Sequence, residues 1–157
     1  MDSGFVLLLA IIVTATIFDF INGFHDTANA IATVVSTRVL SPLAAVLMAA
    51  FFNFVGAFTG TNVAKTVGRD IVDPSNSTQV IVLCSLLAAI IWNLITWYFG
   101  LPSSSSHALI GGLIGAALSG NGFNLGIIKG DGVSKVIIGL VTSPIAGFII
   151  GYFFMVA

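Results

Sequence analysis

The chain has 157 residues, of which 57% are hydrophobic and only 7% are charged. A soluble domain typically carries about 25% charged residues, so this composition excludes a water-soluble body and predicts a multi-pass protein of the cell membrane with the lipid bilayer as its partner. Five Lys and Arg residues against six Asp and Glu residues give a net charge of −1, without the basic patch that a nucleic-acid partner would need.

The first predicted element is an apolar helix over residues 5–21, which is nearly long enough to cross a hydrocarbon core of about 30 Å. It runs past signal-peptide length and lacks the positive start of one, so we expect it to be retained. A polar motif at residues 22–30 follows. Gly23 allows the backbone to leave helical geometry there, and we expect the helix to break and to resume over residues 28–37.

The middle of the chain contains two further apolar spans. Residues 43–64 form the first, and residues 80–99 form the more uniform second. Between them, residues 65–79 are the most hydrophilic stretch, so we expect a loop in water or at the lipid headgroups. Cys84 is the only cysteine; it excludes a disulfide within the chain, and we expect it to be a small buried side chain.

The last third contains one short and one long apolar segment. Residues 108–118 are too few to span comfortably and predict a re-entrant or half helix. A glycine-rich loop at residues 119–132 leads to a final span at residues 133–157. The sequence therefore predicts one all-α transmembrane domain, residues 1–157, with about four to six transmembrane or half helices.

The first of two polar constellations lies in and before the motif at residues 22–30. It contains Asp19, Asn22, His25, Asp26, Thr27 and Asn29. Burying such groups without partners costs several kcal/mol in total, and an unwound segment with oxygen ligands suits a small hard cation. Asp26 or His25 could instead carry a proton. The alternative is a surface loop at residues 22–27, with Asp19 as an interfacial charge.

The second constellation is the run Pro102-Ser103-Ser104-Ser105-Ser106-His107. Proline suits the first turn of a helix and serine is a preferred N-cap. A helix N-terminus has free amides and a partial positive charge, so it can bind an anion without Lys or Arg. The alternative is that the serines only cap a helix at the interface and that His107 only caps or packs.

Together the two constellations suggest a broken-helix transporter with a cation site and an anion site. A membrane enzyme would need a nucleophile and a base at a set spacing. Ser106 and His107 are adjacent, so they point about 100° apart on a helix, and no acid lies within sequence reach. We therefore do not expect an enzyme.

Residues Asn22–Ala32 strongly resemble the signature of the inorganic phosphate transporter family (the PiT or PHO4-type permeases), which reads roughly Gly-x-Asn-Asp-x-Ala-Asn-Ala. The His25-Asp26 pair matches the variant of the bacterial low-affinity transporters, which has His-Asp for Asn-Asp. Residues Pro102–Leu109 resemble the second motif of the family, Pro-x-Ser-Ser/Thr-Ser/Thr-His. The two motifs stand in the family's order, and the resemblance covers essentially the whole chain.

This resemblance implies symport of inorganic phosphate with H⁺ or Na⁺. Asn53 stands where sodium-coupled relatives tend to have glutamate, which favours H⁺. The implied phosphate ligands are Ser104, Ser105, Ser106, Asp26 and Asn22. The implied coupling-ion ligands are Asp26, Asn29 and Asn22, and the possible proton carriers are His25, His107 and Asp19. A divalent metal is possible cargo together with phosphate, whereas no cofactor and no structural metal are expected.

Members of the family have two inverted halves, each with both motifs, and this chain resembles the N-terminal half only. The resemblance therefore implies that a second half or a second copy completes the site. Two alternatives remain open: a non-transporting assembly or regulatory subunit or an inactive fragment, and a permease for sulfate or another oxyanion.

Overall fold

The computed structural model describes residues 2–58 and 66–156, and this part of the chain is all-α, which confirms the predicted fold class. Its main helices are α1 (Ser3–Ser36), α2 (Pro42–Ala57), α4 (Gln79–Tyr98), α5 (Ser105–Gly120) and α6 (Gly130–Val156). Three short elements join them: η1 (Thr66–Asp70), η2 (Pro74–Asn76) and η3 (Leu125–Ile127). Helices α1, α4 and α6 are long and apolar enough to cross a membrane.

Helix α1 is continuous, so the predicted break at residues 22–30 is wrong. Its 34 residues rise about 50 Å at 1.5 Å per residue, more than a bilayer core needs. A single glycine inside a helix costs only about 1 kcal/mol, so Gly23 permits a break without enforcing one. The polar side chains of the motif bond to neighbouring helices instead of competing for their own backbone. The helix ends at Ser36, one residue before the predicted end at residue 37, and Arg38 follows its C-cap with a φ of 60°.

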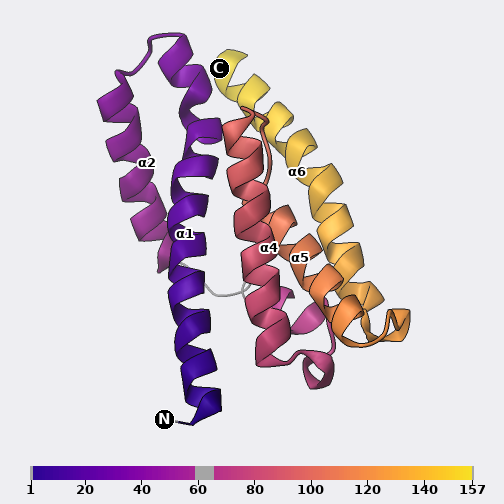
Figure 1. Ribbon diagram of the computed structural model, residues 1–157. Helices are drawn as coiled ribbons and strands as arrows, with labels where there is room; N and C mark the ends of the chain where they lie inside the picture. The colour runs from indigo at the N-terminus through magenta and orange to yellow at the C-terminus, as the bar shows by residue number, and fades with distance from the viewer. Residues whose placement is uncertain (1, 59–65, 157) are drawn as a thin grey trace.

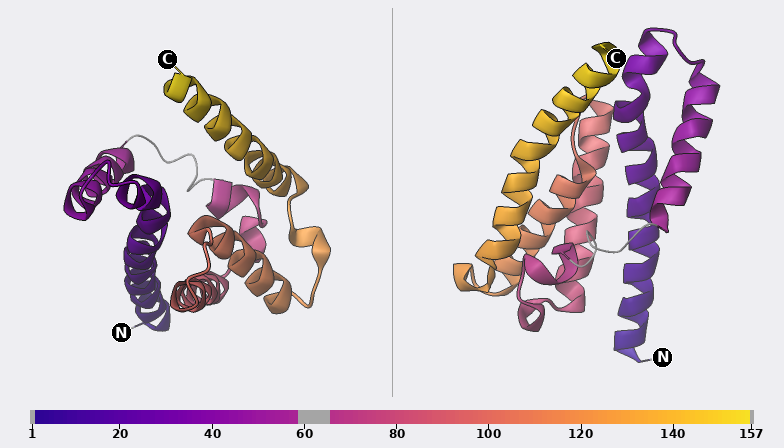
Figure 2. Two further views of the ribbon diagram at one scale, coloured as in Figure 1. Left: turned by 90° about the horizontal axis from the view of Figure 1, so that it is seen from above. Right: turned by 180° about the vertical axis from the view of Figure 1, so that it is seen from behind.

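Seen from above, the helices are arranged along an open arc that runs from α2 through α1, α4 and α5 to α6 (Figure 2). Helix α2 lies on one side of α1 and α4 on the other, α5 packs on α4, and α6 meets the body mainly through η1. Helix α2 covers residues 43–57 of the predicted span 43–64, and Phe58 is its C-cap. The rest of that span, residues 59–64, lies outside the described residues.

Helix α5 begins beside the upper part of α4, well inside the body of the molecule (Figure 1). The chain turns back after α4, where the N–H of Leu101 donates to the carbonyl of Thr96. Farther along, a Cβ on Gly112 would lie 2.7 Å from the carbonyl oxygen of Ser85, so the two helices are in close contact. With 16 residues, α5 matches the predicted half helix but is longer than residues 108–118.

The contact of α1, α4 and α5 has an apolar layer in its lower part. Its buried members are Phe18, Ile21, Leu86, Ala89 and Ile90, with Ala108 and Leu109 of α5 packed against them. Cys84, expected to be buried, is exposed. It lines a hollow on the face of α4 and α5, and its position in an apolar run does not indicate which face of the helix it occupies.

The predicted loop at residues 65–79 is partly folded where the structure describes it. Ile71 and Val72 are 0% and 2% exposed, and Val72 forms an isolated bridge with Ile128. The backbone N–H of Lys129 donates to the Ile71 carbonyl over 2.9 Å. A Cβ on Gly132 would collide with the carbonyl oxygen of Asp70, so glycine allows α6 to approach this segment. The hydrophilic stretch thereby anchors the start of α6.

Candidate functional site

A polar layer lies directly above the apolar layer, on the same three helices. Its buried polar side chains are those of His25 on α1, four residues after Ile21, and of Asn93 and Thr96 on α4, three and six residues after Ile90. Ser105, at the start of α5 and three residues before Ala108, is the fourth, and all four residues are between 0% and 5% exposed. Polar groups this deep in an apolar body are costly unless they are paired or bind something.

His25 connects α1 to α4 through this layer. Its Nε2 lies 3.2 Å from the hydroxyl of Thr96, and its Nδ1 lies 3.3 Å from Oδ1 of Asp26. The His25 side chain is 4% exposed, whereas that of Asp26 is 41% exposed. The imidazole is therefore enclosed between the helices, and the carboxylate is at the edge of a more open space.

Several buried polar atoms of the layer have no hydrogen-bond partner among the described residues. They are Oδ1 of Asn22, both side-chain polar atoms of Asn93 and the hydroxyl oxygen of Ser105. Each such atom costs about 1–3 kcal/mol relative to a paired one. An arrangement of this cost, at the N-terminus of a helix, indicates that the layer binds something polar.

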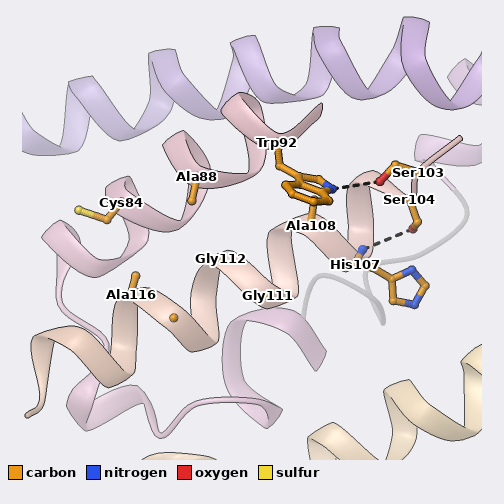
Figure 3. A pocket seen from close by; sticks show the side chains of 11 residues that line it. Cys84, Ala88, Trp92, Ser103, Ser104, His107, Ala108, Gly111, Gly112 and Ala116 are labelled. Carbon is orange, nitrogen blue, oxygen red and sulfur yellow. Dashed lines mark hydrogen bonds between the residues drawn. The ribbon is translucent and has the colours of Figure 1, made fainter. Parts of the chain in front are cut away.

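A second contact joins the two sequence motifs directly. The side-chain amide of Asn29 donates to the backbone carbonyl of Ser103 over 3.4 Å. Ser103 also accepts a hydrogen bond from the indole N–H of Trp92 over 3.2 Å (Figure 3). The serine run is thus held between α1 and α4.

The hollow between α1 and α2 has a volume of about 750 Å³. Its polar lining residues are Asp19, Asn22, Asp26, Thr27 and Asn53. The side chain of Asn53 on α2 donates to the hydroxyl of Thr27 over 3.3 Å, so the two helices are bonded across the hollow. Asp19 and Asp26 are its only ionisable lining residues among those described. We call this space the acidic hollow.

A second hollow, of about 660 Å³, lies on the face of α4 and α5 (Figure 3). Ser103, Ser104, His107 and Trp92 line one end of it, and small residues line the rest. Ser104 is the N-cap of α5, and its hydroxyl accepts from the backbone N–H of His107 over 3.4 Å. We call this space the serine hollow.

The three implied serine ligands have different surroundings. Ser104 is half-buried and lines the serine hollow, Ser105 is fully buried beneath it, and Ser106 is exposed. All three are in the first turn of α5 or cap it, where backbone amides lack partners within the helix. A ligand at this end of α5 would meet hydroxyls and amides together.

Comparison with known proteins assigns the family. Residues 22–157 match the Phosphate transporter family. The chain belongs to this family. Because the family is one of permeases and three helices are of spanning length, the chain is a multi-pass protein of the cell membrane and not an enzyme, as predicted.

The relatives carry names that agree with one another. The chain is 54% identical over 154 residues to a probable low-affinity inorganic phosphate transporter of Bacillus subtilis (strain 168), covering 97% of this chain and 46% of that protein. It is 52% identical over 149 residues to one of Streptomyces halstedii, covering 93% of this chain and 68% of that one. It is 46% identical over 160 residues to the low-affinity inorganic phosphate transporter PitB of Escherichia coli (strain K12), covering 94% and 32%. The chain spans less than half of the Bacillus and Escherichia proteins. No solved structure matches it.

This member of the phosphate transporter family brings its two motifs together only in part. The side chain of Asn29 donates to the backbone carbonyl of Ser103, which joins the first motif to the second. However, Asp26 lines the acidic hollow and Ser104 lines the serine hollow, and the two linings share no residue. His107 is exposed in the serine hollow, and Asp19 is exposed in the acidic one.

Sequence reasoning missed Asn93 and Thr96 as members of the site. Both were inside the span that was read as uniformly apolar. The available signal was their spacing, because polar residues three apart lie on one face of a helix, and polar side chains at membrane depth usually face the protein interior. Among the described residues, no three His, Cys, Asp or Glu side chains gather to hold a metal ion.

Proposed function

We propose that the chain is one half of a cation-coupled transporter of inorganic phosphate. The observation that carries this is the N-terminus of α5, which begins beside the upper part of α4 with Ser104 as its cap. The hydroxyl of Ser105 in its first turn and the side chain of Asn93 on α4 are buried without partners among the described residues. Helices α1, α4 and α5 contain no Lys or Arg, so helix amides and hydroxyls are the donors available to an anion. The names of the relatives support phosphate as that anion.

Phosphate would bind through the free amides of the first turn of α5 and the hydroxyls of Ser104, Ser105 and Ser106. Asn22 would contribute its side-chain amide from α1, where its Oδ1 is buried without a partner among the described residues. Asp26, also implied as a ligand, would accept a hydrogen bond from a P–OH group of HPO4²⁻ or H2PO4⁻, or would meet the anion across a bound cation, because an ionised carboxylate only accepts. A cation held between Asp26 and phosphate would couple the two substrates.

The coupling ion would bind near Asp26, with Asn22 and Asn29 as neutral oxygen ligands. We favour H⁺ over Na⁺, because the residue across the acidic hollow is the neutral Asn53 and because His25 contacts Asp26 directly. His107 and Asp19 are further proton carriers on this proposal, one in each hollow. A divalent metal would travel as cargo, bound to phosphate.

A second half, or a second copy of the chain, would complete the site. The Bacillus relative is more than twice as long as the segment it shares with this chain. Both hollows are open at the side of the described helices, and the apolar window of α6 has no buried residue. A second half packed against these faces would enclose the two hollows.

The test is uptake of labelled phosphate into proteoliposomes. The chain replaces the matching segment of the Bacillus transporter, and the chimera is compared with variants Asp26→Asn and Ser105→Ala. We expect both to lose uptake at least tenfold. Ser134→Ala on α6 is the matched control, because its hydroxyl bonds only to its own helix, and should transport normally.

The same preparation distinguishes the alternatives. Imposed proton and sodium gradients are tested separately, and excess unlabelled sulfate tests the choice of anion. Uptake driven only by sodium contradicts proton coupling, and full inhibition by sulfate contradicts selectivity for phosphate. Normal uptake in both Asp26→Asn and Ser105→Ala contradicts the site. A folded chimera without any uptake favours a non-transporting subunit.

A further inference from the structure

Thr96 makes an unusual set of contacts for a threonine inside a membrane helix. It is 3% exposed, and its hydroxyl lies 3.0 Å from the carbonyl oxygen of Trp92 and 3.1 Å from that of Asn93. A bond to the preceding turn is common for threonine in helices. This hydroxyl also meets a side chain of another helix, His25, at 3.2 Å.

The directions of these bonds follow from counting protons. A hydroxyl has one proton, and both backbone neighbours of the Thr96 hydroxyl are carbonyl oxygens, which only accept. With two carbonyl oxygens beside it, we assign the hydroxyl proton to these carbonyls. The Thr96 oxygen is then the acceptor, and Nε2 of His25 carries the proton of their contact and donates it to Thr96.

This assignment also determines which partner the second ring nitrogen of His25, Nδ1, faces. With Nε2–H directed to Thr96, Nδ1 faces Oδ1 of Asp26 at 3.3 Å. A hydrogen bond there holds one proton, on either the ring or the carboxyl group. Because the imidazole is buried between the helices, it cannot turn freely, and the carboxyl group bonded to it is held as well.

We propose that Thr96 and His25 are positioning residues that orient the Asp26 carboxyl group toward the acidic hollow. The hydrogen-bond chain Thr96–His25–Asp26 reaches from α4 to α1 and ends on the edge of the hollow that Asp26 lines. Neither Thr96 nor His25 lines that hollow, so both act through Asp26. The proposal rests on the proposed function for its transport consequence, but the orientation of His25 is independent of it.

A purely structural role for Thr96 makes a different prediction. Valine has nearly the shape of threonine without the hydroxyl, and serine keeps the hydroxyl without the methyl group. If Thr96 only fills space, Thr96→Val is harmless and Thr96→Ser is the damaging change. If it positions His25, the order is reversed.

The first experiment observes His25 directly, without transport. The chain has two histidines, so the variant His107→Gln leaves His25 as the single ¹⁵N-histidine signal. We expect NMR in lipid to show Nε2 protonated and hydrogen-bonded. In Thr96→Val the proton at Nε2 should lose its acceptor and the nitrogen shifts should change, whereas Thr96→Ser should restore the original signal.

The second experiment measures phosphate uptake by the chimera. We expect Thr96→Val to raise the apparent KM about tenfold, as the loss of one hydrogen bond to a group held near a charge implies. Thr96→Ser should remain within about twofold of the unsubstituted chimera on the same scale. Thr14→Val on α1 is the matched control, because the Thr14 hydroxyl bonds only to Ala10 of its own helix.

The outcomes separate the two proposals. A His25 spectrum that is unchanged in Thr96→Val overturns the positioning role, as does a KM for Thr96→Ser as high as that for Thr96→Val. A chimera without uptake contradicts the proposed function alone, and the NMR result then still decides whether Thr96 orients His25.

Discussion

The apolar layer and the polar layer are formed by the same three helices, about one turn apart, but their side chains differ in polarity and in how well they are paired. The apolar layer joins side chains such as Ile21, Leu86 and Ala89 in close contact. The polar layer places His25, Asn93 and Ser105 at equal burial, partly without partners. Since lipid is as apolar as leucine, helices in a membrane associate through close packing, so the lower layer stabilises the assembly. The upper layer reduces stability, and on the proposed function it holds groups that bind the substrates.

The largest expected effect tests the apolar layer. Leu86→Ala removes a side chain that is 7% exposed and leaves a cavity between helices, which should reduce the free energy of unfolding by about 2–5 kcal/mol. Thermal unfolding in detergent measures this. Leu140→Ala on α6 is the control, because that side chain is 52% exposed. An equal loss in both variants would mean that the apolar layer does not hold the helices together.

The next effect tests how closely α5 approaches α4. Gly112→Ala would place a Cβ 2.7 Å from the Ser85 carbonyl oxygen, and the helices must separate to relieve this, at a cost of about 1–3 kcal/mol. The neighbouring Gly111 has open space at the same position, so Gly111→Ala should be neutral or slightly stabilising. Unfolding of the two variants in parallel checks the contrast. Equal stability of both would contradict the close contact.

A third prediction concerns the polar layer, where stability and function should oppose each other. Asn93→Leu replaces two buried atoms without partners by an apolar side chain of similar size, so it should raise the free energy of unfolding by about 1–2 kcal/mol. Phosphate uptake by the chimera should be lost. Such a trade is typical of residues kept for function.

The control for Asn93 is Ser85, which is also buried but whose hydroxyl donates to the Val82 carbonyl over 2.7 Å. Ser85→Ala breaks a satisfied bond, so it should not stabilise the chain, and it should leave uptake intact. If Asn93→Leu also destabilises the protein, the side chain of Asn93 makes stabilising contacts and is not an unpaired polar group that lowers stability.

The apolar layer was largely predictable and the polar layer was not, for a physical reason. Span and helix ends follow from local composition: residues 80–99 were predicted and α4 covers Gln79–Tyr98. The predicted break at Gly23 is wrong because polar side chains of α1 find partners on other helices, as His25 does with Thr96. These contacts stabilise a continuous α1. Which face Asn93 or Cys84 occupies depends on neighbours that no local pattern specifies.

The site was predictable to the level of its motifs. The order of the two motifs correctly indicated the family, and Ser104 caps α5 as serine preferences suggest. The motifs did not predict that Asp26 and Ser104 line two different hollows. This separation depends on α2 packing against α1 and on α5 packing against α4. The roles of Asp26, Asn29 and the serines stay predictions.

The smallest expected effect lies outside both layers and shows how little an exposed polar group contributes. Hydrogen bonds from the backbone N–H and the hydroxyl of Ser75, together with the charge of Lys129, lower the pKa of Asp73. A carboxyl group with a lowered pKa stabilises the fold above its unfolded pKa of about 3.9, and this contribution is lost as pH falls through the folded value. Between pH 5 and pH 3, the melting temperature should therefore fall slightly more in the unsubstituted chain than in Asp73→Asn. The fall in Ser75→Ala should be intermediate, because the hydrogen bond from the backbone N–H of residue 75 to Asp73 remains. A steeper fall in Asp73→Asn would reverse the sign and would mean that Asp73 is stabilised in its protonated form.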